Sequence, residues 1–261
     1  MNNLILVRHG QSKWNKEKRF TGWADIDLTK RGEEEAAHAG KLVKELNIEF
    51  DAYFTSVQKR AINTLKIILN ILNKANAEVK KAWELNERHY GALTGLNKDE
   101  MINKHGSEQV HIWRRSFDVH PPKMNLSNPH HPIKNKTYKN IPIKKIPQSE
   151  SLKDTFKRVV PYYHSKIEPL VLSKKNVLIS AHGNSLRALC KKIFNVSNEK
   201  IVDFEIPTGN PLLISFAENT NLKDKLDENT SLVSSLTSDL HESKKFELVI
   251  ENNKKQESQV I

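Results

Sequence analysis

Near its beginning the chain reads Leu4-Ile5-Leu6-Val7-Arg8-His9-Gly10-Gln11-Ser12, an aliphatic run that breaks abruptly into an arginine, a histidine and a glycine. A short apolar run bounded by polar residues, here residues 3–7, predicts a buried strand of a mostly parallel sheet. Ligands of such sheets bind beyond the carboxyl ends of the strands, where Arg8 and His9 would stand. Gly10 is expected to let the backbone approach an anion closely. The stretch therefore predicts a strand that delivers a histidine into a phosphate site.

The same arrangement, a strand followed by His-Gly, occurs again later in the chain. Residues 176–181 form a second apolar run, which ends in His182-Gly183-Asn184-Ser185 and leads into a helix-like stretch over residues 186–194. A single histidine after a strand is more often an ordinary hydrogen-bonded residue. Two histidines that follow two strands of one sheet are instead expected to meet at the same sheet edge.

Further polar groups follow the next predicted strand. Residues 53–56 predict a short strand, and Arg60 lies in the first turn of the helix predicted after it. The run Glu87-Arg88-His89-Tyr90-Gly91 comes later. Arg60 and Glu87 are expected to join the two histidines in one pocket. The ordinary alternative for Glu87 is an ion pair with Arg88 or another cation, and His89 is expected to be structural.

Apolar stripes at helical spacing predict helices between the strands. Thr29 can cap a helix over residues 30–46, and residues 58–74 predict a second helix. Residues 150–172 predict a longer helical stretch, which Pro161 and Pro169 interrupt. Strands that alternate with helices predict an α/β fold, here a three-layer sandwich with a mostly parallel central sheet flanked by helices.

Residues 97–149 differ from the rest because prolines break up a polar segment that holds ten Lys or Arg. A surface loop is the ordinary interpretation, but long loops commonly carry binding groups, and Trp113-Arg114-Arg115 is expected on a short helix. We expect residues 1–216 to form one catalytic domain, with this excursion at the active site. Residues 217–261 are expected to form a divergent, flexible tail with one short apolar run at residues 246–250.

Length and composition exclude several classes of protein. A chain of 261 residues can form a single α/β domain with a substantial core. Cys190 is the only cysteine, so an intrachain disulfide framework and a cysteine-based zinc site are excluded. No run approaches the roughly 18 apolar residues of a membrane span, and no secretion signal is evident. We expect a soluble cytoplasmic protein without a membrane partner.

The formal net charge of +11 raises the alternative of nucleic-acid binding. From Ala217 onward the chain holds six Lys and nine Asp or Glu, so the basic excess belongs to residues 1–216. Arginines at positions 8, 60, 88, 114 and 115 lie in or beside the motifs, as expected for a small polyanionic substrate. We therefore expect no nucleic-acid partner.

Taken together, the motifs resemble those of the cofactor-dependent phosphoglycerate mutases of the histidine phosphatase superfamily, over roughly residues 3–216. The stretches that carry the resemblance are Arg8-His9-Gly10-Gln11-Ser12-Lys13-Trp14-Asn15, Phe20-Thr21-Gly22-Trp23, Glu87-Arg88-His89-Tyr90-Gly91, Trp113-Arg114-Arg115, His182-Gly183-Asn184-Ser185 and Ile206-Pro207-Thr208-Gly209. The chain departs from the family pattern at Gln11, where Glu is expected, and at Ser149, where Thr is usual. In the family, the excursion covers the active site and the C-terminal segment helps to close it.

The resemblance implies a role for each matching residue. It makes His9 the phosphoryl-accepting nucleophile and Glu87 the proton donor and base, with Arg8, Arg60 and His182 around the phosphoryl group. Arg114 and Arg115 would bind a carboxylate or phosphate through paired hydrogen bonds. The expected substrate-binding residues are Ser12, Asn15, Thr21, Gly22, Tyr90, Lys98, Arg114, Arg115, Gly183 and Asn184.

The implied reaction interconverts 3-phosphoglycerate and 2-phosphoglycerate, with 2,3-bisphosphoglycerate as the primer and no metal. A histidine nucleophile suits this reaction, because two transfers through the enzyme are easier than one direct migration. Three alternatives stay open: a histidine-type phosphatase, a bisphosphoglycerate mutase and, ranked low, a non-catalytic scaffold of the same fold. The resemblance also implies a homodimer or homotetramer whose other partners are small-molecule phosphoglycerates.

Overall fold

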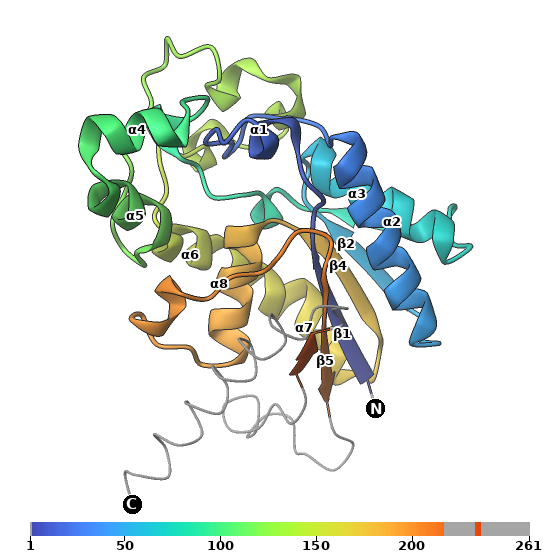
Figure 1. Ribbon diagram of the computed structural model, residues 1–261. Helices are drawn as coiled ribbons and strands as arrows, with labels where there is room; N and C mark the ends of the chain where they lie inside the picture. Colours follow the sequence, from blue (N-terminus) through green and yellow to red (C-terminus); the bar gives the residue numbers. More distant parts are fainter. Residues whose placement is uncertain (1, 217–232, 236–261) are drawn as a thin grey trace, which may run out of the picture.

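The computed structural model describes residues 2–216 and 233–235. In this part of the chain a single six-stranded sheet has the strand order β3-β2-β4-β1-β5-β6 (Figure 1). The four strands β3, β2, β4 and β1 are parallel, whereas β5 runs antiparallel to β1 and β6 runs antiparallel to β5. The strand bounds are β1 Asn2–Arg8, β2 Ala52–Thr55, β3 Val79–Lys81, β4 Val177–Ala181, β5 Pro211–Phe216 and β6 Val233–Ser235. The prediction of a mostly parallel central sheet is confirmed.

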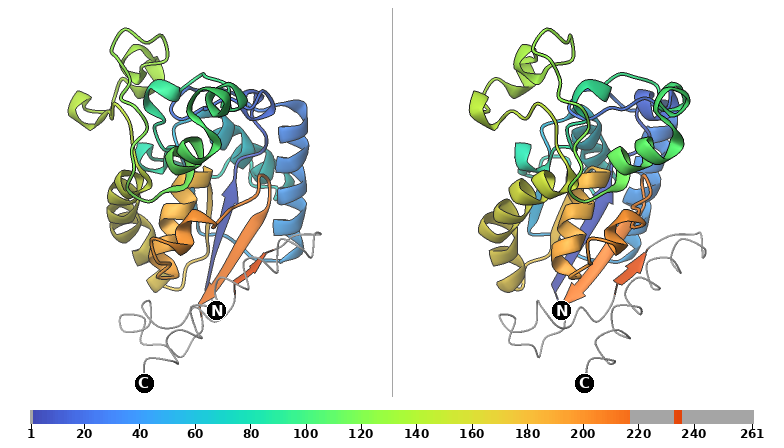
Figure 2. Two further views of the ribbon diagram at one scale, coloured as in Figure 1. Left: turned by 60° about the vertical axis from the view of Figure 1, so that its left-hand side comes forward. Right: turned by 90° about the vertical axis from the view of Figure 1, so that its left-hand side faces the viewer.

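Helices cover both faces of the sheet (Figures 1 and 2). Along β1, Leu4 and Leu6 belong to the core beneath α6 and α8, whereas Ile5 and Val7 belong to the core beneath α2 and α3. Successive side chains of a strand point to opposite faces, so an uninterrupted aliphatic run is what a strand between two helical layers requires. The main helices are α2 Lys30–Glu45, α3 Lys59–Ile71, α6 Leu152–Tyr162, α7 Glu168–Leu172 and α8 Gly183–Ile193. The predicted three-layer sandwich is confirmed.

The predicted helices form with small changes at their ends. Thr29 caps α2, its Oγ1 accepting a hydrogen bond of 3.0 Å from the backbone N–H of Gly32. In the helical stretch predicted over residues 150–172, Pro161 and Pro169 do not interrupt the helical backbone. Between α6 and α7 the chain makes a wider π-helical turn at Tyr163–Ile167. Such a turn accommodates the hydrogen bonds that a proline cannot donate.

The excursion of residues 97–149 is ordered and lies over the end of the sheet at which β1 and β4 finish (Figure 2). Two small cores anchor it: one packs Met101 and Val110 against Phe20, and the other packs Tyr138 against Trp23. Its two helices are α4 Lys98–His105 and α5 Ser107–Arg115, which confirms the short helix expected at Trp113-Arg114-Arg115. Its 3-10 turns are η3 Pro132–Lys134, η4 Lys136–Tyr138 and η5 Ile143–Lys145.

The short elements outside the excursion are α1 Lys13–Lys16, η1 Trp83–Leu85, η2 Gly91–Leu93 and η7 Lys200–Val202. Of the predicted tail, only β6 belongs to the described residues. The apolar run at residues 246–250 lies outside them. Within the described ranges, none of the helices combines the length and apolar character that crossing a membrane requires.

Candidate active site

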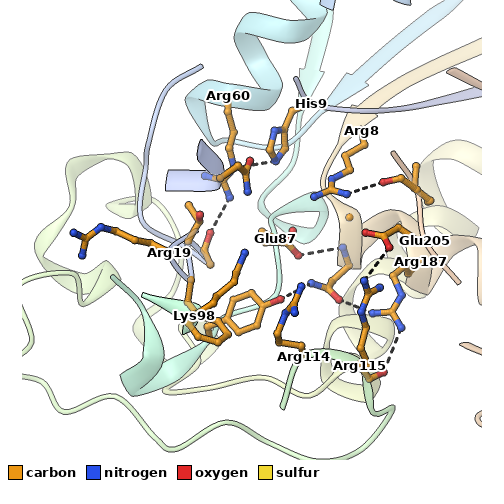
Figure 3. Close-up of a pocket in the computed structure, with 18 residues that line it drawn as sticks. Arg8, His9, Arg19, Arg60, Glu87, Lys98, Arg114, Arg115, Arg187 and Glu205 are labelled. Carbon is orange, nitrogen blue, oxygen red and sulfur yellow. Dashed lines mark hydrogen bonds and ion pairs between the residues drawn. The ribbon is translucent and has the colours of Figure 1, made fainter. Parts of the chain in front are cut away.

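A pocket lies beyond the carboxyl ends of β1 and β4, between the sheet and the excursion (Figure 3). Its charged lining is mainly cationic. The cationic lining residues are Arg8, Arg19, Arg60, Lys98, Arg114, Arg115 and Arg187, and the acidic ones are Glu87 and Glu205. Cations so close together in a partly buried pocket repel one another unless an anion lies among them. The lining is therefore suited to a small, multiply charged anion.

The parallel pairing of β1 with β4 brings the two predicted histidines together. Arg8 pairs with Ala181 at the ends of these strands, and the backbone N–H of His9 donates a 3.0 Å hydrogen bond to the Ala181 carbonyl. His9 and His182 are the next residues on either strand, and their ring centroids lie 5.0 Å apart. The repeated strand-His-Gly arrangement thus places two imidazoles side by side at one sheet edge.

His9 presents an unprotonated ring nitrogen. Its Nδ1 lies 2.7 Å from the carbonyl oxygen of Gly10, and because a carbonyl only accepts, we assign the ring proton to Nδ1. Its Nε2 accepts a 3.2 Å hydrogen bond from Nε of Arg60. Burial, followed by the charges of Arg60 and Arg8, holds the pKa of His9 well below its ordinary value. A neutral imidazole with its lone pair on Nε2 is the nucleophilic form.

Arg60 is fixed by backbone acceptors in the first turn of α3. Its side chain is buried, and it donates to the carbonyls of Ala24, at 3.0 Å, and Gly22, at 2.8 Å. Gly22 has φ +52°, a left-handed conformation that a side chain would strain. Burial lowers the pKa of Arg60 somewhat, yet guanidinium stays protonated in proteins. The turn around Gly22 therefore holds a cation directly against the nucleophilic nitrogen.

His182 is oriented by Ser56. The Ser56 Oγ accepts from the backbone N–H of Gln58 at 3.1 Å, and it lies 2.7 Å from Nε2 of His182. The hydroxyl proton is therefore free to be donated to Nε2, which leaves the ring proton on Nδ1. Among the described residues, this Nδ1 is buried without a hydrogen-bond partner. Burial, with the charges of Arg60 and His9, keeps the pKa of His182 well below its ordinary value. A neutral N–H donor beside His9 suits a phosphoryl oxygen.

The N-terminus of α8 supplies a further anion-binding element. Arg8 donates to the carbonyl of Ile206 at 2.7 Å, and its Nε has no partner within the described ranges. A Cβ added to Gly183 would lie 3.4 Å from this Nε. A side chain at position 183 would therefore contact the Arg8 guanidinium. Backbone N–H groups at a helix N-terminus attract phosphate. Here the Asn184 N–H already donates to Glu87, and Gly183 before it adjoins the Arg8 guanidinium.

Glu87 is a buried carboxylate whose position is set by backbone groups. Its Oε1 accepts hydrogen bonds from the backbone N–H groups of Arg88, at 2.8 Å, and Asn184, at 3.1 Å. Its own carbonyl accepts from Trp23 Nε1 at 2.6 Å and from Arg158 Nη2 at 2.9 Å. The second carboxylate oxygen is left for exchange of a proton with a ligand. The alternative role of ion-pair partner to Arg88 is not observed.

The segment around Tyr90 and the excursion together build the opposite end of the pocket. Tyr90 lies beneath the guanidinium of Arg88, whose carbon is 4.7 Å from the ring centroid. Burial raises the pKa of Tyr90, but the charge and hydrogen bond of Arg88, with the charge of Lys98, outweigh it and lower that pKa to about 8. Burial also lowers the pKa of Lys98. Figure 3 shows Lys98, Arg114 and Arg115 on the side of the pocket away from His9.

Of the fifteen residues predicted for the site, all but His182 and Ser12 line this pocket. His182 lies beside His9 without lining the pocket. Ser12 caps α1: its Oγ accepts from the Asn15 backbone N–H at 3.2 Å and donates to Asn15 Oδ1 at 2.8 Å. The expected contact between Ser12 and phosphate stays a prediction.

Gly10 also has a different role from the expected one. It does not line the pocket. A Cβ on Gly10 would lie 2.0 Å from the carbonyl oxygen of Gly32 in α2. Glycine is thus needed where this loop crosses a helix, rather than where a ligand approaches.

Three charged lining residues were missed by sequence reasoning. Arg19 directly precedes the Phe20-Thr21 motif, and Glu205 directly precedes Ile206-Pro207. Their position next to these motifs was the one sequence feature that could have indicated a place in the site. Glu205 forms an ion pair of 3.0 Å with Arg115. Arg187 lies within the predicted helix after His182, and no local pattern indicates that it faces the pocket.

The site fits phosphate groups in the number and kind of its unused donors. Two residues that line the pocket, Arg8 and Thr21, have buried atoms without a hydrogen-bond partner in the described part of the chain, Arg8 Nε and Thr21 Oγ1, and so does His182 at Nδ1, next to His9. Buried donors of this kind normally have acceptors, and phosphoryl oxygens would supply several at once. Within residues 2–216 and 233–235, no group of three or more His, Cys, Asp or Glu is arranged to hold a metal.

Comparisons with known proteins agree with this geometry. The model of the histidine phosphatase superfamily (branch 1) matches residues 4–131. The fold also resembles the α-ribazole phosphatase of Shigella flexneri, with a TM-score of 0.63 and 19% identity over 91% of this chain and 98% of that one. A mycobacterial glucosyl-3-phosphoglycerate phosphatase gives a TM-score of 0.61 at 19% identity, over 82% of this chain and 93% of that one. The protein is a member of the histidine phosphatase superfamily.

Sequence relatives narrow the family further. The chain is 55% identical over 224 residues to a 2,3-bisphosphoglycerate-dependent phosphoglycerate mutase of Pelagibacter ubique (strain HTCC1062), covering 86% of this chain and 94% of the relative. It is 51% identical over 225 residues to an enzyme of the same name from Hydrogenobaculum sp. (strain Y04AAS1), covering 86% and 91% respectively. The chain belongs to the 2,3-bisphosphoglycerate-dependent phosphoglycerate mutases, as the motifs had indicated.

Proposed function

We propose that the protein interconverts 3-phosphoglycerate and 2-phosphoglycerate through a phosphohistidine at His9, primed by 2,3-bisphosphoglycerate. The observation that carries this proposal is His9 Nε2, which accepts a hydrogen bond from a buried guanidinium in a pocket that Glu87 and seven cationic residues also line. The bisphosphate supplies the phosphoryl group that first loads His9. The names of the relatives support the same reaction.

In the transfer step, the lone pair of His9 Nε2 attacks phosphorus, an N–P bond forms, and the bond from phosphorus to the substrate oxygen breaks. Negative charge spreads over the equatorial oxygens in such a transition state. Arg8, Arg60 and the N-terminus of α8 surround this position with donors, and preorganised donors of this kind supply most of the stabilisation. His182 Nδ1 adds a neutral donor. Once the phosphoryl group is on His9, Arg60 Nε can donate to a phosphoryl oxygen instead of the ring.

Proton transfer is assigned to Glu87. As the substrate oxygen leaves phosphorus, the Glu87 carboxyl group donates its proton to that oxygen. In the reverse half-reaction the carboxylate removes the proton from the other hydroxyl, which then attacks the phosphohistidine. The starting protonation state is thereby restored. The backbone N–H groups that hold Oε1 keep the carboxyl group in place for both steps.

The far end of the pocket is assigned to the carboxylate of the substrate. Arg114 and Arg115 offer paired donors that match a carboxylate, while Lys98 and Tyr90 lie beside them. Holding this end lets the glycerate present its other hydroxyl to His9 without escaping. The same walls limit the access of water, which would release phosphate.

The alternative function is phosphatase activity, because a site built around the same superfamily nucleophile can pass its phosphoryl group to water. The cationic excursion favours the mutase, since a phosphatase has less need to grip a carboxylate. Bisphosphoglycerate mutase activity uses the same groups on a related substrate. We further propose that the protein acts in glycolysis and gluconeogenesis as a cytoplasmic homodimer or homotetramer, which light scattering and cell fractionation would test.

The test is conversion of 3-phosphoglycerate to 2-phosphoglycerate in EDTA, with and without a trace of 2,3-bisphosphoglycerate, while free phosphate is monitored. We expect isomerisation that depends on the bisphosphate, survives chelation and is lost in His9→Ala. Phosphate release without isomerisation would move the protein to the phosphatases. Absence of both products from folded wild-type protein would point to a non-catalytic scaffold.

A further inference from the structure

Arg187 is a buried arginine that the proposed reaction does not use. It lies on α8, three residues after Asn184, and only 3% of its surface is exposed. Its Nη1 donates to Asn184 Oδ1 at 2.9 Å, and its Nη2 donates to the carbonyls of Arg115, at 3.3 Å, and Ile201. One guanidinium therefore joins three segments: α8, the C-terminal turn of α5 and the turn η7.

The first effect of Arg187 is on the Asn184 amide. Because Oδ1 accepts from Arg187, the Nδ2 group faces the pocket, where it donates to the Tyr90 hydroxyl at 3.3 Å. An asparagine side chain can rotate by half a turn and exchange its donor for its acceptor. Without Arg187, the amide would be free to present its oxygen to an anionic ligand and repel it.

The second effect is on the end of α5. The last carbonyls of a helix have no partner within the helix. Arg187 binds the carbonyl of Arg115, and Arg88 binds that of Arg114 at 2.7 Å. Cations are favoured at a helix C-terminus. Two buried arginines thus dock the turn from which the Arg114 and Arg115 side chains reach the pocket.

The buried position of Arg187 disfavours the charged form of its guanidinium. Burial, with the neighbouring charges of Arg88 and Arg115, lowers its pKa to about 9. Its Nε is buried without a partner in the part of the chain that the structure describes. A lysine cannot reproduce several contacts of a planar, fork-shaped donor. The geometry is therefore specific to arginine.

We propose that Arg187 is a positioning residue that determines affinity for the carboxylate end of the phosphoglycerate, by fixing the Asn184 amide and docking the Arg114-Arg115 turn. None of its hydrogen bonds reaches His9, Arg8, Arg60 or His182, so phosphoryl binding at His9 does not depend on it. This inference rests on the proposed function and deepens it.

The experiment compares two ligands by calorimetry on the full chain: 3-phosphoglycerate, which needs both ends of the pocket, and inorganic phosphate, which needs only the His9 end. We expect Arg187→Gln to weaken 3-phosphoglycerate binding about tenfold or more and to leave phosphate affinity unchanged. Arg187→Lys should recover only part of the loss. In turnover, KM should rise more than kcat falls.

Lys191→Met is the matched control. Lys191 lies one turn farther along α8, contacts the carbonyl of Val196 and the ring of Phe117, and does not line the pocket. This variant should keep both affinities. The double variant Asn184→Ala, Arg187→Gln should lose less binding free energy for 3-phosphoglycerate than the two single variants lose together, because Arg187 acts in part through the Asn184 amide.

An equal loss of both affinities in folded Arg187→Gln would overturn the proposal, as would unchanged 3-phosphoglycerate binding. These binding measurements do not require turnover. Failure of the wild-type protein to isomerise would contradict the proposed function, whereas the difference between the two ligands would still test Arg187.

Discussion

Nε of Arg60 donates a 3.2 Å hydrogen bond to Nε2 of His9, the ring nitrogen that carries no proton. Burial, reinforced by this permanent cation, holds the pKa of His9 well below its ordinary value and so keeps the imidazole neutral. In the proposed reaction the same side chain would first favour the nucleophilic form of His9 and then donate to the phosphoryl group.

Arg60→Lys should slow the loading of His9. Lysine keeps the charge, but it cannot donate to Gly22, Ala24 and His9 in one fixed geometry. We expect a fall of about 100-fold or more in the first transfer, measured in a single turnover with radiolabelled bisphosphate. Lys59→Ala, an exposed neighbour, serves as the control. Unchanged labelling of Arg60→Lys would contradict the assigned role.

Glu87→Gln should separate proton transfer from positioning. The Gln Oε1 can still accept from the backbone N–H groups of Arg88 and Asn184, so the local structure should persist. We expect kcat to fall about 100-fold or more, within the usual contribution of general acid–base catalysis, with little change in KM. Steady-state rates, checked by circular dichroism for folding, provide the measurement. A variant with wild-type kcat would exclude Glu87 as the proton donor.

Glu205→Gln should tighten substrate binding. The Glu205 carboxylate neutralises Arg115 at the edge of the pocket, where the substrate carboxylate is expected to bind. The pair is partly exposed and worth at most about 1 kcal/mol, so KM should fall no more than about fivefold, with kcat unchanged. Asp203→Asn removes the same charge from an exposed site outside the pocket and should leave KM as it is. A raised KM in Glu205→Gln would show that the carboxylate helps binding.

Ser12→Ala should reduce stability without reducing catalysis. The change removes the N-cap of α1, at a cost of about 1 kcal/mol in the free energy of unfolding. Asn15 should keep its orientation because its Oδ1 also accepts from the backbone N–H of residue 12 at 3.1 Å. Urea unfolding and KM would be measured together, with Thr29→Ala as a second cap variant. A large rise in KM for Ser12→Ala, without one for Thr29→Ala, would support a direct contact between Ser12 and phosphate.

The buried histidines should make the fold sensitive to acid. Burial lowers the pKa of His9, His182 and His89, the last to about 3. The unfolded chain binds protons at these residues below about pH 6.5, whereas the folded protein does not. The free energy of unfolding should therefore fall as the pH drops from about 7 to about 5, by about 2 kcal/mol for each histidine.

Urea titrations at several pH values would measure this slope. His89→Asn should reduce the fall in the free energy of unfolding between about pH 7 and about pH 5 by the contribution of one histidine, because asparagine does not titrate there. The fold should persist, since the amide oxygen can replace Nδ1 as acceptor for the Gly91 N–H, which lies 2.9 Å from that atom. Stability that does not change over this pH range would show that these histidines are protonated in the folded state.

Much of the fold and the chemical centre could be predicted because both depend on short, local patterns. An aliphatic run defines a strand buried on both faces, and the residue after it must lie at the sheet edge. His9 and His182 therefore meet for reasons that each stretch carries separately. Ser12 shows how a local pattern can carry two meanings: its Ser-x-x-Asn spacing to Asn15 indicates the helix cap that the structure contains, whereas its contact with phosphate stays a prediction.

Long-range packing explains what could not be predicted. Gly10 is required by the crossing of α2, which no pattern near Gly10 reveals. Arg187 faces the pocket because α5 and η7 pack beside α8, and a helical stripe does not show which neighbours will surround it. Glu205 becomes part of the site only through its ion pair with Arg115, ninety residues away in sequence.

The excursion joins the rest of the protein through two small apolar cores and through the backbone carbonyls of Arg114 and Arg115, which accept hydrogen bonds from Arg88 and Arg187. The scaffold thus supplies both histidines, whereas the lining of the far end of the pocket is divided between scaffold and insertion. Exchange of the insertion alone would keep the histidine pair and Arg187 but discard Arg114 and Arg115, so the two parts of the lining must change together for the pocket to accept another phosphorylated acid.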